Sequence, residues 1–148
     1  MSNENDQADD KIVIGAVEHI SLPELGIVNI PVRVDTGAKR SALHAANIRI
    51  KRIDGKRIVD FEVVTGERGY FRKQAASAEL KQIREFTSSN GGVTRRPMIV
   101  TTFQLGDLTW KSQVSLIDRS SLRYRMLLGR MSIRNRFVVD VSSTFLMD

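Results

Sequence analysis

The chain has 148 residues, of which 41% are hydrophobic and 27% charged, a composition typical of a soluble globular protein with room for one real core. It contains no cysteine, which excludes disulfides and thiolate chemistry. The formal net charge of +6 leaves three interpretations open, because charge alone does not separate a solvated basic surface from a nucleic-acid partner or an acidic protein substrate.

The first ten residues are polar and acidic, and they lack the basic and apolar regions of a signal peptide. No apolar run approaches the ~20 residues that a membrane span requires. We therefore predict a disordered tail over residues 1–10, one folded domain over residues 11–148, and a cytoplasmic location with no membrane partner.

The first half of the domain reads as short strands separated by turns. Residues 21–26 predict a turn, and residues 41–46 fit either a strand or one helical turn. Asp54-Gly55 is one of the strongest short signals for a β-hairpin. Strands are expected where apolar and polar residues alternate, over residues 12–20, 27–34, 48–50 and 57–64.

The second half continues this pattern as far as one late helix. Residues 73–80 are weakly patterned and allow a short helix, whereas residues 131–136 predict one. The run from Ser88 to Gly92 predicts a flexible hairpin tip. Further strands are expected over residues 83–86, 96–103, 126–128 and 137–139, and residues 104–110 and 111–117 predict another hairpin around Gly106-Asp107. Many short strands with regular turns predict a small, closed, all-β domain.

The strand over residues 27–34 leads directly into Asp35-Thr36-Gly37. The carboxylate would then sit at a strand end, and Gly37 would permit a backbone turn that a residue with a Cβ resists. Aspartate, threonine and glycine are also ordinary turn residues. The tripeptide by itself is therefore compatible with a plain Asx turn and with a catalytic carboxylate.

Two motifs in the right order make the second interpretation more specific. Asp35-Thr36-Gly37-Ala38 after a hydrophobic strand resembles the active-site loop of retropepsin-like aspartic peptidases, and Leu127-Leu128-Gly129-Arg130 is similar to their late hydrophobic-hydrophobic-Gly-Arg element. The resemblance implies a small closed retropepsin-like barrel with one short C-terminal helix. It also implies a substrate-covering flap whose tip contains Ser89, Asn90, Gly91 and Gly92.

Longer segments, residues 21–26, 34–45 and 125–130, resemble a bacterial family labelled ATP-dependent zinc protease, some of whose members accompany ligases that append glutamates to proteins. The chain has no glycine-rich phosphate loop for ATP and no His-Glu-x-x-His for zinc. Its two histidines, His19 and His44, are far apart in sequence. We therefore predict no cofactor and a structural role for His44 near the Asp35 loop, with a zinc site of two histidines and a carboxylate as the alternative.

The resemblance implies catalysis by two carboxylates that share one proton, because two charges about 3 Å apart cannot both persist. The chain has one such loop, so we predict a twofold homodimer in which each protomer supplies Asp35. Thr36 would hydrogen-bond across the axis, and Gly37 would let the substrate backbone approach closely. The flap would close over the substrate and exclude water.

The loop continues Ala38-Lys39-Arg40, where viral retropepsins commonly have Ala-Asp-Asp. The resemblance places these residues beside the substrate cleft, and it leaves open what Arg130 contacts, since its equivalent often pairs with such an acid. We therefore predict an aspartic endopeptidase acting on acidic, glutamate-rich protein segments. The alternatives are a zinc-dependent peptidase and a non-catalytic basic β-barrel that binds nucleic acid, for which an aromatic content of 6% offers few stacking platforms.

Overall fold

The computed structural model describes residues 10–65, 71–87 and 89–148, so most of the predicted tail lies outside the described residues. A 3-10 turn, η1, spans Pro23–Leu25, and a short helix, α2, spans Arg130–Ile133. The strands are β1 (Ile12–Gly15), β2 (Val17–Leu22), β3 (Ile27–Val34), β4 (Ser41–His44), β5 (Ala46–Ile53), β6 (Lys56–Thr65), β7 (Arg72–Glu79), β8 (Gln82–Thr87), β9 (Val93–Leu105), β10 (Leu108–Ile117), β11 (Met126–Leu128) and β12 (Phe137–Asp140). Within the described ranges, no helix has the length and apolar character needed to span a membrane.

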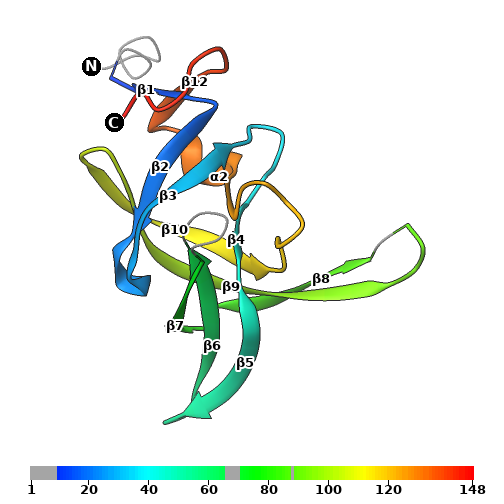
Figure 1. Cartoon of the computed structure of the whole chain (residues 1–148). Helices are drawn as coiled ribbons and strands as arrows, with labels where there is room; N and C mark the ends of the chain where they lie inside the picture. Colours follow the sequence, from blue (N-terminus) through cyan, green and yellow to red (C-terminus); the bar gives the residue numbers. More distant parts are fainter. Residues whose placement is uncertain (1–9, 66–70, 88) are drawn as a thin grey trace, which may run out of the picture.

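Six of these strands close a barrel in the order β10-β4-β11-β3-β2-β9, and antiparallel pairing of β9 with β10 completes the circle. The strand β8 adds to β9 beyond the barrel, and the β8–β9 hairpin projects from it as an arm (Figure 1). The prediction of a small, closed, all-β domain with a short late helix is therefore confirmed.

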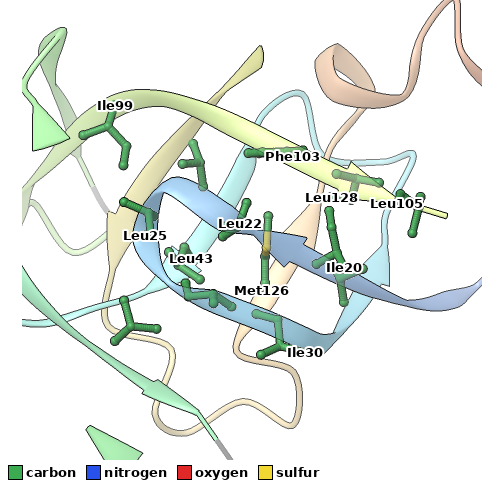
Figure 2. Close-up of a cluster of buried hydrophobic side chains, with 14 of the residues drawn as sticks. Ile20, Leu22, Leu25, Ile30, Leu43, Ile99, Phe103, Leu105, Met126 and Leu128 are labelled. Carbon is green, nitrogen blue, oxygen red and sulfur yellow. The ribbon is translucent and has the colours of Figure 1, made fainter. Parts of the chain in front are cut away.

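The barrel is filled by the apolar residues that alternate along its strands. In β3, Val32 and Val34 are buried whereas Arg33 between them is exposed, as period-2 alternation requires. Side chains from the barrel strands meet in one buried cluster, part of which is drawn in Figure 2, and Leu22, Leu43, Phe103, Met126 and Leu128 in it are all fully buried. Each such side chain stabilises the fold by about 1.5–3 kcal/mol, which gives the loop after β3 a rigid base.

A second sheet of three strands, in the order β5-β6-β7, packs one face against the barrel core. Its first hairpin turns at Asp54 and Gly55, whose φ angles of 51° and 79° are those of a type I′ turn, so this prediction is confirmed. The short helix allowed over residues 73–80 is wrong. That segment is β7, paired with β6 along its whole length, and burial of Ala76 and Ala78 against the core outweighs the helix propensity of alanine.

The strand predicted over residues 12–20 is two strands. Between them the chain passes so close to the C-terminal segment that a Cβ on Gly15 would lie 2.4 Å from the carbonyl oxygen of Ser143. The Ala16 N–H donates to that oxygen (2.7 Å), and β1 leaves the barrel to pair in parallel with β12. The alternation of apolar and polar residues continues from β1 into β2, so the sequence alone did not show the break between the two strands.

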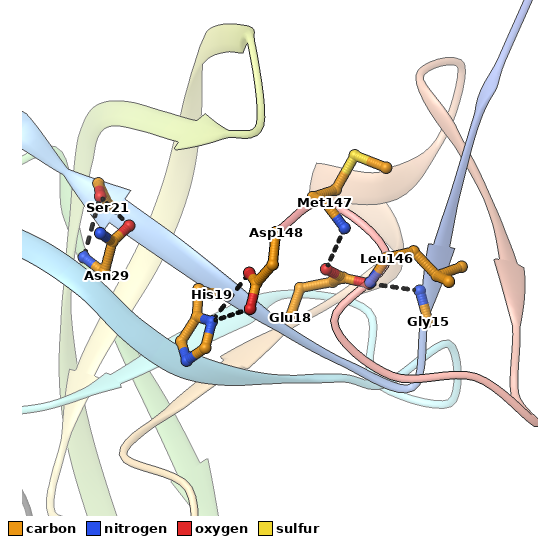
Figure 3. A network of polar contacts seen from close by, with 8 residues as sticks. All are labelled: Gly15, Glu18, His19, Ser21, Asn29, Leu146, Met147 and Asp148. Atoms are coloured by element: carbon orange, nitrogen blue, oxygen red, sulfur yellow. Dashed lines mark hydrogen bonds and ion pairs between the residues drawn. The ribbon is translucent and has the colours of Figure 1, made fainter.

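The C-terminal segment is fixed by a buried carboxylate (Figure 3). Glu18 in β2 is fully buried, and its oxygens accept hydrogen bonds from the backbone N–H groups of Gly15 (2.7 Å), Leu146 (3.0 Å) and Met147 (3.0 Å). These donors satisfy a charge that would otherwise be costly to bury. Glu18 therefore joins the two ends of the domain.

Candidate active site

The loop after β3 places Asp35 at the end of a buried strand. The Asp35 N–H donates to the Leu128 carbonyl at 2.9 Å, and the Ala38 N–H returns to the Asp35 carbonyl at 3.2 Å. The Asp35 carboxylate is half-buried, and its Oδ1 accepts the Gly37 N–H at 2.9 Å. The backbone therefore fixes both the position of this residue and the orientation of its carboxylate.

The reason for glycine at position 37 differs from the one expected. Gly37 is not among the residues with positive φ, so the turn does not depend on left-handed backbone. A Cβ at this position would lie 3.2 Å from Asp35 Oδ1, closer than most such contacts. Glycine is favoured here because it leaves room for the carboxylate. Thr36 and Gly37 are both exposed, so the outer side of the loop is accessible.

The first residues of α2 hydrogen-bond to the backbone of the Asp35 loop. The Arg130 N–H donates to the Ala38 carbonyl (2.8 Å) and the Met131 N–H to the Lys39 carbonyl (2.9 Å). Arg130 Nη1 donates to the carbonyls of Thr36 (3.0 Å) and Gly37 (3.1 Å). Positions 39 and 40 hold Lys39 and Arg40 in place of an acid, so Arg130 contacts backbone carbonyls and not a carboxylate. Its guanidinium binds the backbone of the Asp35 loop.

A cluster of three serine hydroxyls connects α2 to the barrel. Ser132 Oγ lies 2.7 Å from Ser41 Oγ and 2.6 Å from Ser112 Oγ, and Ser41 Oγ accepts the Gly129 N–H at 3.0 Å. Ser41 and Ser132 are buried. Sequence reasoning missed this cluster, because isolated serines far apart in a chain carry no signal that they meet.

His44 lies at the end of β4 and is 5% exposed. Its Nδ1 accepts the backbone N–H of Arg119 at 2.8 Å, so a neutral ring carries its proton on Nε2. Burial lowers the pKa of His44, and the positive charge of Arg125 acts in the same direction. In the structure His44 therefore holds the backbone of the loop that follows β10.

Arg119 in that loop is a second residue that sequence reasoning missed. Its side chain is buried, and its Nε donates to the Tyr124 carbonyl at 3.1 Å. Burial lowers the pKa of the Arg119 guanidinium, whereas the negative charge of Asp35 opposes this shift. A buried cation therefore lies within electrostatic reach of Asp35. A lone arginine before two serines gave no indication of this.

The residues predicted to bind substrate lie in two places. Lys39 is exposed and Arg40 is half-buried beside the Asp35 loop. The predicted flap tip is the exposed turn of the β8–β9 hairpin, with Gly91 at a φ of 85°, while Ser88 lies outside the described residues. The paired strands of this hairpin and the residues after Asp35 line a common cavity, whereas the tip residues Ser89, Asn90, Gly91 and Gly92 do not line it.

The two histidines considered as zinc ligands have other partners. His19 Nδ1 lies 3.0 Å from the carboxylate of Asp148, and its ring stacks on Phe145 with centroids 4.4 Å apart. His44 binds the Arg119 backbone as described. Residues 10–65, 71–87 and 89–148 contain no group of three or more histidines, cysteines or acids placed to hold a metal ion.

Residues 13–148 match a family model described as RimB-like, retropepsin-like aspartic endopeptidase RimB. The chain belongs to this family. The RimB-like family description agrees with the retropepsin resemblance carried by residues 35–38 and 127–130. The zinc-protease label is not carried by this description or by the names of the relatives below.

The curated relatives of the chain extend well beyond the region that matches it. A probable alpha-L-glutamate ligase of Shewanella halifaxensis is 39% identical over 140 residues, which cover 93% of this chain and 30% of that protein. One of Desulfotalea psychrophila is 37% identical over 133 residues, covering 88% and 28%. The chain thus spans less than a third of these curated relatives. The crystal structure of Lpg0085, a Legionella pneumophila protein of unknown function, superposes with a TM-score of 0.78 at 27% identity, covering 92% of this chain and 98% of that one.

Proposed function

We propose that this protein is a homodimeric aspartic endopeptidase in which each protomer supplies Asp35. The observation that carries the proposal is the carboxylate at the end of β3, whose Oδ1 accepts the Gly37 N–H while Arg130 binds the loop carbonyls. The exposed outer side of this loop supports a second protomer meeting it about a twofold axis, with Thr36 as the residue that bonds across the axis.

The chemistry follows from two Asp35 carboxylates that share one proton. The ionised carboxylate takes a proton from water, and the resulting nucleophile attacks the scissile carbonyl carbon. The protonated carboxylate donates to the carbonyl oxygen. When the tetrahedral intermediate collapses, the C–N bond breaks and the leaving nitrogen takes the proton that the first carboxylate removed from water, while the proton on the former carbonyl oxygen returns to the other carboxylate. The β8–β9 hairpin serves as the flap that covers the substrate and excludes water.

An acidic substrate is supported by the charges around the loop. Lys39 and Arg40 directly follow the loop, and the buried Arg119 lies within electrostatic reach of Asp35. The formal net charge of +6 favours encounter with acidic chains. The glutamate ligases among the relatives contain a similar domain, which supports glutamate-rich protein segments as the substrate.

The decisive test replaces Asp35 with Asn, which preserves size but cannot hold the charge that activates water. We expect Asp35→Asn to fold normally and to lose activity on a glutamate-rich protein by about 10³-fold or more. Asp54→Asn, in the exposed β5–β6 turn, is the matched control and should keep full activity. Near-normal turnover by Asp35→Asn would refute the aspartic mechanism.

The dimer is tested by dilution. Activity per protein chain should fall once the concentration drops below the dimer dissociation constant, because the pair of carboxylates exists only between protomers. Sedimentation at the assay concentration identifies the active species. A monomer with full activity would overturn the dimeric site.

A further inference from the structure

A cavity of about 390 Å³ lies beside the Asp35 loop, between the residues that follow Asp35 and one face of the paired β8 and β9 strands. Its size is that of a small-ligand site. Its lining includes the side chains of Lys39, Arg40, Arg84, Phe86, Arg96 and Ser115. Four of these six are cations, and among the described residues no aspartate or glutamate lines the cavity.

The strand register of the hairpin explains this concentration of charge. Arg84 in β8 pairs directly with Arg96 in β9, and the next pair is Glu85 with Arg95. Because successive side chains point to opposite faces, Arg84 and Arg96 share one face and Glu85 and Arg95 the other. On the far face, Arg95 Nε lies 3.3 Å from Glu85 Oε1. On the cavity face two like charges stand opposite each other, an arrangement that destabilises a sheet.

Within the described part of the chain, the cations of the cavity have no counter-ion. In the described part of the chain, none of Lys39, Arg40, Arg84 and Arg96 forms an ion pair with a carboxylate. Arg40 Nε and Arg96 Nε are also buried without a hydrogen-bond partner there. A buried donor without an acceptor costs about 1–3 kcal/mol. A carboxylate is the acceptor that suits a guanidinium, because it takes two parallel N–H bonds at once.

An aromatic ring completes the cavity. Phe86 is 39% exposed, and the Arg96 guanidinium lies 4.1 Å from the centre of its ring. This stacking holds Arg96 at the cavity wall, and the exposed part of the ring offers apolar contact. The cavity therefore combines paired donors with a surface suited to methylene groups.

We propose that this cavity is a binding site for a carboxylate on a short aliphatic stem, and that its ligand is a glutamate side chain of the substrate held in the adjacent cleft. Arg84 and Arg96 determine the specificity, and Phe86 contacts the methylene groups. The source of the carboxylate rests on the proposed function. The cavity itself lies within one chain, so binding requires neither cleavage nor a second Asp35.

The test measures binding of a fluorescein-labelled peptide of six glutamates to the Asp35→Asn protein by fluorescence anisotropy, with a six-glutamine peptide as the neutral probe. In this background, Arg84→Gln and Arg96→Gln should each weaken glutamate-peptide binding about tenfold, as expected for loss of a charged hydrogen-bonding group. Arg95→Gln removes the same charge from the opposite face and should change binding less than twofold. Arg96→Lys, which keeps the charge but not the planar fork, should fall in between.

Thermal unfolding shows whether each variant is folded. If Arg96→Gln does not fold, Arg84→Gln tests the proposal by itself. Equal weakening by Arg95→Gln and Arg84→Gln would overturn the proposal, since general charge attraction would then explain binding. The proposal would also be overturned if Arg84→Gln bound the glutamate peptide as tightly as the parent protein does, or if the glutamate and glutamine peptides bound equally well. If the wild type never cleaves the peptide and yet binding follows the expected order, the endopeptidase proposal fails while the carboxylate site stands.

Discussion

The Asp35 loop and the β5–β6 turn are both short connections after a strand, but they are held in different ways. The loop is bonded to residues more than ninety positions away, through the Leu128 carbonyl and the Arg130 guanidinium. The turn at Asp54 and Gly55 is set by its own backbone angles and by its flanking strands. The sequence can therefore specify the turn locally, whereas the loop depends on the completed barrel.

The largest contrast should come from adding one methyl group to a glycine in each region. A Cβ on Gly129, beneath the loop, would lie 2.5 Å from the Arg40 carbonyl carbon, so backbone must move. We expect Gly129→Ala to lower the free energy of unfolding by about 3 kcal/mol. Gly55→Ala meets no atom within 4 Å but keeps a positive φ, and should cost about 1 kcal/mol. Urea unfolding measures both, and equal losses would contradict the contrast.

A smaller effect is expected at the serine cluster. Ser132→Ala removes a buried hydroxyl that lies within hydrogen-bond distance of both Ser41 and Ser112, and should cost about 2 kcal/mol. Ser77 in β7 is exposed, where its hydroxyl donates to Asp60, so Ser77→Ala should stay within about 0.5 kcal/mol of the wild type. Calorimetry on the two variants decides this. A Ser132→Ala protein as stable as Ser77→Ala would mean that the cluster does not support α2.

The exposed Arg130 should affect the loop more than the whole fold. Arg130→Gln removes the donor to the Thr36 and Gly37 carbonyls, and we expect the Ala38 amide to exchange with solvent about fivefold faster, which corresponds to about 1 kcal/mol. Arg134→Gln is the control, since Arg134 is exposed and its Nη1 lies 3.9 Å from Met131 Sδ. If the Ala38 amide exchanged at the same rate in Arg130→Gln, the backbone hydrogen bonds of the loop would be enough to hold it without the Arg130 guanidinium.

The smallest effect concerns pH. The pKa of His44 is lowered in the fold, so the unfolded chain binds its proton at a higher pH than the folded one. Stability should therefore decrease as pH falls below about 6.5. Between pH 7 and 5.5 the wild type should lose at most about 1 kcal/mol more than His44→Asn, whose side-chain oxygen can still accept the Arg119 N–H. Parallel pH profiles for the two proteins would disprove this.

The same contrast explains which features were predictable from the sequence. The β5–β6 turn and the bounds of β3 follow from local patterns, and both agree with the structure. The position of Asp35 at a strand end followed from β3 and the motif after it. The approach of Arg119 to Asp35, the meeting of Ser41 with Ser132, and the break at Gly15 could not be predicted, because each depends on segments brought together only by the fold.

The buried Glu18 has a consequence for synthesis of the protein. Its carboxylate is satisfied by the amides of Leu146 and Met147, which follow it by 128 and 129 positions. On a ribosome, β2 leaves the exit tunnel long before these amides do, so the Glu18 carboxylate has to stay hydrated until residues 146 and 147 have emerged. Burial of Glu18 with its full set of donors is therefore a late step in the folding of this domain.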